Sequence, residues 1–297
     1  MINKIKLIGL LLVLVTQGCV RDGVDECPEG NVKLRFYAEK FQNRSQDPLS
    51  DREANFYERV NHIRYFLYKD DVLYKSDIVT VFDKTILDSY TLDFNNLEYG
   101  NYKIAMVANS TKSALAGDPA LIDNLFITYP GSKNTEDYFS NVFSFTVDST
   151  DSKEYQVGLL RLQGVIRYTF RNLPEDASNI EVIMENVAAE KWIAGDYKKI
   201  YRADLRYATI PVTRAVEGYV MATFPTVTNM RSRLDVNLYR TNEERAYVTQ
   251  MVSDTLTVTR NQLLDVVLTY NSGQFDCEIL LDTSWDGSSN GGQIGIQ

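Results

Sequence analysis

Short segments that alternate apolar and polar residues follow one another along almost the whole sequence, and this pattern restricts the fold more than any other feature. Side chains of a strand point alternately to opposite faces of a sheet, so a period of two indicates a half-buried strand. No long stretch repeats with the helical period of about 3.6 residues. The strand-like segments are residues 31–37, 60–68, 77–81, 89–94, 102–108, 143–147, 154–162, 165–170, 179–184, 218–224, 234–239, 246–248, 256–258, 263–270 and 275–281. Strands this short, at roughly 8–12-residue spacing, favour β-sandwiches.

Two sets of these segments lie on either side of a polar stretch, residues 148–153, which we expect to be a linker. A chain of 297 residues exceeds the usual length of one domain, and its 19 tyrosines and 13 phenylalanines suit β structure. We therefore predict an all-β protein with one β-sandwich over residues 31–155 and a second over residues 156–285. Residues 110–134 are expected to form a loop with one helical turn, and residues 286–297 a flexible tail.

The first residues have the features of a bacterial signal peptide. Lys4 and Lys6 precede an apolar run at residues 7–15, which is shorter than the roughly 20 residues that span a bilayer. A buried N-terminal strand or helix is the alternative interpretation of this run. The basic flank and the change to polar residues at Thr16 favour the signal peptide.

The end of this signal predicts a lipoprotein. Gly18 supplies the small residue, and Cys19 the thiol that would accept a diacylglycerol before cleavage. Cleavage after residues 16–18 by ordinary signal peptidase is the alternative, for which these residues are poorly suited. We therefore predict that residues 1–18 are removed, that Cys19 carries a covalent lipid, and that residues 19–30 form a tether.

The three cysteines leave one pairing open. If Cys19 carries lipid, Cys27 and Cys277 remain, and an oxidising compartment beyond the inner membrane would allow them to form a disulfide. The alternative is two separate thiols. The sequence alone does not decide, because a disulfide requires Cα atoms within about 7 Å of each other.

Charge and motifs exclude several classes of function. The net charge of −9 disfavours nucleic-acid binding, which needs a basic surface. The sequence has no zinc-protease, phosphate-loop, nucleophile-elbow or dinucleotide motif. The single histidine, His62, lies in a strand-like segment and is expected to be a solvated or hydrogen-bonded residue. We therefore predict no enzymatic activity, no metal, no small-molecule substrate and no cofactor other than the lipid.

Carboxylates are plentiful but fall where turns are expected. The pairs Asp70-Asp71, Glu136-Asp137 and Glu243-Glu244 are therefore interpreted as solvated turn residues.

A Leu-x-x-Gly-x-Tyr run at Leu97, Gly100 and Tyr102 predicts a structural corner. The glycine permits a turn that leads directly into a strand. The tyrosine hydroxyl is then expected to fold back onto the loop, as at the corner of Greek-key sandwiches.

The order of several motifs resembles a known family. Glu26-Cys27-Pro28-Glu29-Gly30 follows the lipid-site cysteine and an acidic spacer, and leads into a strand at residues 32–36. The Leu97, Gly100, Tyr102 run leads to Ala108-Asn109, residues 160–167 follow the pattern Leu-Arg-Leu-x-Gly-x-Ile-Arg, and a late strand leads to Trp285. Together these are similar to the anchor lipoproteins of Bacteroidales type V fimbriae, the FimB-type anchor subunits. Glu26 replaces the usual aspartate, and Met106-Val107 replace a frequent aromatic residue.

This resemblance implies two tandem transthyretin-like Greek-key β-sandwiches after a lipoprotein signal peptide. It also implies a surface-exposed position at the cell outer membrane, where the protein holds the first pilin subunit through β-strand complementation. Two alternatives remain: a surface glycan-binding lipoprotein that uses Trp192 or Trp285, and a fimbrial tip adhesin on the same fold.

Overall fold

A computed structural model of the chain describes residues 28–42, 47–80, 86–110, 114–129, 137–198, 206–215 and 218–282. The expected signal peptide, Cys19, Cys27 and Trp285 lie outside these ranges. Strands dominate, and the only α-helices in the described ranges are four residues long, α2 (Phe56–Arg59) and α3 (Val212–Ala215). The expected all-β sandwich fold is confirmed.

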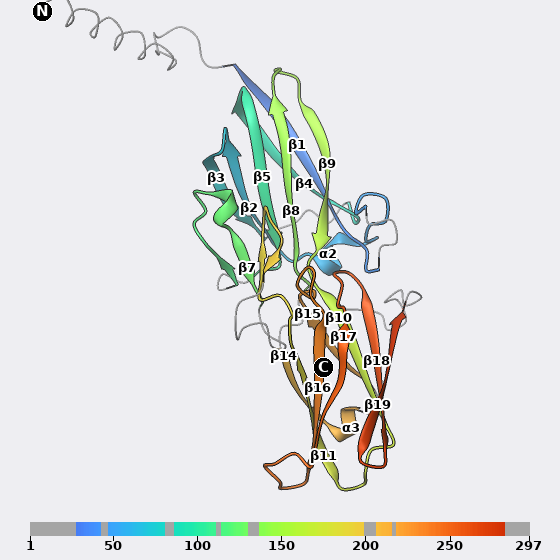
Figure 1. The fold of residues 1–297 in the computed structure, drawn as a ribbon. Helices are drawn as coiled ribbons and strands as arrows, with labels where there is room; N and C mark the ends of the chain where they lie inside the picture. The colour runs from blue at the N-terminus through green and yellow to red at the C-terminus, as the bar shows by residue number, and fades with distance from the viewer. Residues whose placement is uncertain are drawn as a thin grey trace, which may run out of the picture.

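The N-terminal half is one long sheet folded onto itself (Figure 1). Its strands, in sheet order, are β3 (Val72–Val79), β2 (Ile63–Lys69), β5 (Gly100–Ala108), β8 (Phe139–Val147), β9 (Lys153–Arg161), β1 (Glu29–Ala38) and β4 (Tyr90–Glu98). β8 and β9 pair through only two residue pairs, Phe139 with Arg161 and Ser140 with Leu160. The sheet bends there, so that β3-β2-β5-β8 faces β9-β1-β4.

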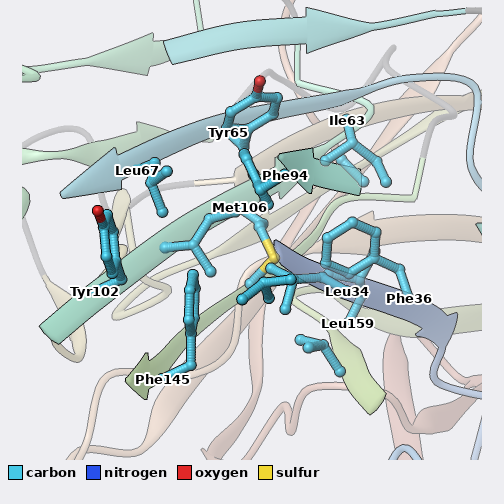
Figure 2. Close-up of a cluster of buried hydrophobic side chains, with 14 of the residues drawn as sticks. Leu34, Phe36, Ile63, Tyr65, Leu67, Phe94, Tyr102, Met106, Phe145 and Leu159 are labelled. Atoms are coloured by element: carbon cyan, nitrogen blue, oxygen red, sulfur yellow. The ribbon is translucent and has the colours of Figure 1, made fainter. Parts of the chain in front are cut away.

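The space between these two layers is filled by apolar side chains (Figure 2). Alternation along β1 directs Leu34 and Phe36 into this core, where both are completely buried. Tyr65 of β2 meets Phe94 of β4 edge to face, with ring centroids 5.6 Å apart. This aromatic pair joins the two layers.

The C-terminal half is a sandwich of two four-stranded sheets. One contains β15 (Tyr219–Thr223), β10 (Gly164–Arg171), β18 (Leu263–Asn271) and β19 (Gln274–Asp282) in that order. The other contains β14 (Arg206–Pro211), β11 (Ala177–Met184), β16 (Ser232–Arg240) and β17 (Val248–Leu256). Each half has one parallel pair, β1 with β9 and β10 with β18, so the two halves repeat the same arrangement.

A small third sheet connects the halves. Its order is β13 (Tyr197–Lys198), β12 (Glu190–Trp192), β7 (Phe126–Thr128) and β6 (Leu115–Ala116). β6 and β7 come from the N-terminal half of the sequence, with the short 3-10 helix η1 (Ile122–Asn124) between them, whereas β12 and β13 come from the C-terminal half. Side chains from both halves share one buried apolar cluster beneath this sheet: Phe66, Tyr68, Ile127, Ala188, Ile193 and Phe224.

The strand order supports a later division between the halves than the one expected from the sequence. The polar residues 148–153 were expected to be a linker, but they join β8 to β9 within the N-terminal sheet. The expected boundary between residues 155 and 156 falls inside β9, which pairs along its whole length except its last two residues with β1. We propose that the boundary lies at Leu162-Gln163, between β9 and β10.

Several short or exposed elements also differ from the expectations. The expected loop over residues 110–134 contains η1 and two short strands, β6 and β7. β17 is continuous over Val248–Leu256, where two separate segments were expected. In the described part of the chain, no helix combines the length and the apolar character needed to cross a membrane.

Candidate functional site

The predicted lipid-site residue Cys19 and the second cysteine, Cys27, lie outside the described residues, which begin at Pro28. The Pro28 carbonyl oxygen accepts a hydrogen bond from the Tyr99 N–H at 2.9 Å, directly before the start of β1. Cys277 is a free, half-buried thiol in β19 of the C-terminal half. The possible Cys27–Cys277 disulfide stays a hypothesis, because Cys27 lies outside the described residues.

The Leu97, Gly100 and Tyr102 corner connects β4 to β5. The Tyr102 hydroxyl donates a hydrogen bond to the carbonyl oxygen of Glu98, four residues upstream, at 2.8 Å. Leu97 is buried in the N-terminal core, and Gly100 has a φ of 155°. Burial raises the pKa of Tyr102 from 10.0 to about 12, since the phenolate would be poorly solvated there. The corner is therefore a packed and hydrogen-bonded structural element.

His62 and two of the acidic pairs occupy unremarkable positions. The His62 Nε2 atom lies 3.0 Å from the Ser110 carbonyl oxygen. Asp70 and Asp71 form an exposed turn with positive φ values, and Glu243 and Glu244 are exposed. No three His, Cys, Asp or Glu side chains in the described ranges are grouped so that they could hold a metal ion.

Trp192 is not an open sugar platform. Its ring stacks on Phe126 with centroids 5.1 Å apart, and the Lys198 ammonium lies 3.5 Å from the ring centroid. The indole N–H donates to the Glu190 carboxylate at 3.1 Å. Protein groups therefore already occupy the π system and the hydrogen-bond donor that a bound sugar would use.

A buried network of charges joins the two halves, and the sequence analysis missed it. Arg161, at the end of β9, is 1% exposed, and its guanidinium donates to Asp137, to Glu53 at 3.1 Å and to the Asn261 side-chain oxygen at 3.1 Å. Asp137 was expected to be a solvated turn residue; it is instead the ion-pair partner of a buried arginine, and that expectation was wrong.

The same network extends into the C-terminal half. Glu39 of the segment after β1 is buried and accepts from Arg260 at 2.7 Å and from the Arg161 backbone N–H at 2.9 Å. Asn261 donates to the Lys40 carbonyl oxygen at 3.0 Å, and Phe41 packs against Val165 and Leu263 of the C-terminal half. The one signal in the sequence was a charged residue, Arg161, within the apolar run Leu159 to Leu162. These contacts make the joint between the halves a packed and hydrogen-bonded interface.

Strands at the edges of the sheets are the places where another chain could add a strand. Most of these edge strands are short, irregular or charged, which disfavours such pairing. β3 carries Lys75 and Asp77 opposite the core residues Leu67 and Tyr65, and its pairing shifts at a bulge. Inward-pointing charges and bulges discourage edge-to-edge pairing. The β1–β4 pairing also shifts, and β4 has Asn96 in the left-handed region with φ 57°.

Two further edges are irregular or short. β17 has two register shifts against β16. β15 is five residues long, and β14 ends in Pro211. Proline lacks the N–H that a ladder needs, so it limits pairing at that end.

β19 is different, because it is long and regular, and in the described residues β17 packs beside only part of its outer edge. It pairs with β18 through nine consecutive residue pairs without a register shift, from Leu263–Asp282 to Asn271–Gln274. It contains no proline, lysine or arginine. Its other side pairs with no further strand in the described part of the sheet.

The backbone of β19 shows which groups point outward. The Gln250 side chain of β17 accepts from the Phe275 N–H at 2.6 Å and donates to the Phe275 carbonyl oxygen at 2.8 Å. The backbone groups of Phe275 therefore point away from β18. Because backbone direction alternates along a strand, those of Cys277, Ile279 and Leu281 point the same way.

The side chains of this segment become more exposed toward its end. Phe275 is buried, Cys277 is half-buried, Ile279 is 38% exposed and Leu281 is 53% exposed. These four alternate residues share one face, and the last two are partly uncovered at this end of β19. We call Cys277, Ile279 and Leu281, with their outward backbone groups, the β19 edge.

The fold is similar to those of solved fimbrial proteins. The fimbrial anchor protein Mfa2 from Porphyromonas gingivalis matches with a TM-score of 0.55 at 10% identity, over 86% of this chain and 98% of that chain. A fimbrial assembly protein from Parabacteroides distasonis matches with a TM-score of 0.51 at 12% identity, over 86% and 99%. A candidate adhesin from Bacteroides ovatus matches with a TM-score of 0.57 at 15% identity, over 90% and 96%.

These structural neighbours confirm, at the level of the fold, the resemblance that the sequence motifs indicate. No family profile matches the sequence, and no curated protein matches it.

Proposed function

We propose that the chain is a lipid-anchored protein of the outer membrane that holds the first pilin subunit of a fimbrium through β-strand complementation. The observation that carries this proposal is the β19 edge, a long regular strand whose outward backbone groups have no strand partner among the described residues. The fold shared with a fimbrial anchor protein and a fimbrial assembly protein supports it. So does the predicted lipid site at Cys19.

The physical basis is the addition of one strand to an incomplete sheet. A segment that pairs with an edge gains main-chain hydrogen bonds, and its alternate side chains fill apolar depressions. The resulting contact is directional and suits a chain of subunits that must resist pulling. No reacting group is needed, which fits a protein whose polar clusters join structural elements.

Deletion of the gene tests the anchoring role. We expect fimbriae to be shed into the medium, and to be retained again when the wild-type protein is supplied. Pilin should co-purify with the wild-type protein from outer membranes. Fimbriae that stay attached in the deletion strain would refute the proposal.

Replacement of the lipid site tests the attachment to the membrane. Cys19→Ala should move the protein from the membrane fraction to the soluble fraction, because acyl chains contribute about 0.8 kcal/mol per buried CH₂. Cys27→Ala is the matched control and should remain membrane-bound. Membrane association of the Cys19→Ala protein would show that the lipid is elsewhere or absent.

A tip subunit is a second candidate, supported by the likeness to a candidate adhesin from Bacteroides ovatus. Immunogold labelling separates the two roles, since an anchor lies at the cell surface and a tip subunit at the distal end. The glycan-binding alternative lacks comparable support, because the Trp192 ring and N–H already have protein partners.

A further inference from the structure

The β19 edge has a chemical character that narrows the kind of segment it could accept. Neither β17 nor β19 contains a lysine or arginine, whereas the two strands contain Asp254, Asp276, Glu278 and Asp282. Asp276 and Glu278 are exposed, as is Asp254. A partner segment would therefore lie in a negative field, and basic residues beside its apolar core would be attracted to it.

The side-chain positions define the apolar part of the segment. Ile279 and Leu281 lie on the face that is directed toward the sandwich interior and are partly uncovered. Cys277 adds a third apolar position, since burial raises its pKa from 9.0 to about 11 and the thiol stays neutral. A partner strand would place every second side chain beside these three residues.

Gln250 shows that the edge already accepts such pairing. Its side-chain amide makes with Phe275 the two hydrogen bonds that a neighbouring strand residue would make. This occupies the first outward position and leaves the next three, at Cys277, Ile279 and Leu281. An incoming segment is thereby confined to the end of β19 that is most exposed.

We propose that the β19 edge accepts an extended segment of another protein in which alternate apolar residues are flanked by lysine or arginine. The identity of that protein, a pilin, rests on the proposed function, whereas the β19 edge is defined by residues of this chain. A second copy of this chain is a poor partner, because two β19 edges would bring Glu278 and its acidic neighbours together, and like charges across a pair destabilise it.

Peptide binding to the full mature chain carrying Cys19→Ala tests the proposal directly. The probe is acetyl-Lys-Val-Thr-Ile-Thr-Val-Lys-amide, labelled for fluorescence anisotropy. Two matched peptides replace the central isoleucine by proline, which removes a backbone donor, or both lysines by glutamate. We expect both to bind about tenfold more weakly than the probe, and binding of the probe to weaken with added salt.

Two variants locate the binding. Ile279→Pro removes an N–H that points away from β18, a position where an edge strand tolerates proline, and should weaken probe binding about tenfold. Val72→Asp alters an exposed apolar residue of β3 and should leave binding unchanged. Circular dichroism checks that both variants are folded, and Leu281→Asp serves if Ile279→Pro does not fold.

The outcomes decide the matter. The proposal is overturned if the probe does not bind or if the glutamate peptide binds as tightly as the probe. It is also overturned if the probe binds equally to a folded Ile279→Pro or Leu281→Asp protein. If the protein dimerises and Ile279→Pro abolishes the dimer, the β19 edge pairs with a second copy of this chain and not with another protein, which would overturn that part of the proposal. In cells, fimbriae retained by the Ile279→Pro protein but shed by the deletion strain would overturn this inference and leave the anchoring role intact.

Discussion

Replacing Arg161 by methionine should destabilise the protein by about 3 kcal/mol. The guanidinium is 1% exposed and makes its side-chain contacts with Asp137, Glu53 and Asn261. Removing one partner of a buried ion pair typically costs about 3–5 kcal/mol, because a charge is left buried and uncompensated. We expect the lower end of this range, because two carboxylates of the network keep another arginine partner. Glu53 still pairs with Arg59 at 3.5 Å, and Glu39 with Arg260 at 2.7 Å. Asp137 has no other ion-pair partner among the described residues.

Urea unfolding of the mature chain, followed by tryptophan fluorescence and circular dichroism, measures this loss. Because the network lies at the joint, we expect the two signals to separate in the variant, with the halves unfolding at different urea concentrations. Adding Asp137→Asn should recover part of the loss, since it removes the uncompensated carboxylate. Arg167→Met is the matched control: Arg167 is 33% exposed and pairs with Asp265 within one sheet, so its loss should cost about 0–1 kcal/mol.

A loss below about 1 kcal/mol for Arg161→Met would refute the reasoning, because that is the value of a solvent-exposed pair. If the Arg161→Met, Asp137→Asn double variant is no more stable than Arg161→Met, then Asp137 is not the charge that the loss of Arg161 leaves uncompensated.

Three further measurements test the fold around these sites. Gly164→Ala should cost about 1–3 kcal/mol in urea unfolding, because its Cβ would lie 2.2 Å from the Thr259 carbonyl oxygen, whereas Gly195→Ala, with its nearest neighbour at 3.4 Å, should be tolerated. Tyr102→Phe should cost about 0.5–1.5 kcal/mol, the value of its hydrogen bond to Glu98, and an unchanged urea midpoint would show that this bond contributes nothing. Stability should fall between pH 10 and pH 12, because burial raises the pKa values of Tyr65, Tyr68 and Tyr102 from 10.0 to about 12. The unfolded chain then ionises first as pH rises, so the stabilisation is complete below pH 10; a urea midpoint constant to pH 12 would contradict this.

The alternation of the sequence predicts the long strands well. β18 and β19 are expected at residues 263–270 and 275–281, and they form at Leu263–Asn271 and Gln274–Asp282. Each has enough residues for several periods, and Ser272 and Gly273, with φ values of 50° and 93°, form the tight turn between them. β6, β12 and β13 have two or three residues each, which is too few for a period to be recognised.

Polar composition is ambiguous at two places. Residues 148–153 have the composition of a linker between domains, but the connection from β8 to β9 uses the same kinds of residue, and we therefore propose a later boundary. The middle of β17 was not expected to be a strand, because its apolar residues do not alternate with polar ones; they are Val248, Met251, Val252 and Leu256. An edge strand with little buried surface has little hydrophobic pattern.

The joint could not be predicted, because its partners are distant in sequence. Arg161 contacts residues that lie 24, 100, 108 and 122 positions away. Nothing local distinguishes Asp137 from any other turn carboxylate. Only the topology, which brings the end of β9 against the segment after β1 and the start of β18, assembles the network.

The arrangement of the two halves gives the joint a mechanical meaning. β1 begins at the end of the N-terminal half remote from the C-terminal half (Figure 1). The β19 edge lies in the other half. If the lipid holds one end and a fimbrium the other, tension passes through the joint, where the described part of the chain crosses once, between β9 and β10. The Arg161 network and the antiparallel sheet of β6, β7, β12 and β13 then share the force, which is why a weakened joint should cause shedding of fimbriae even though the β19 edge is intact.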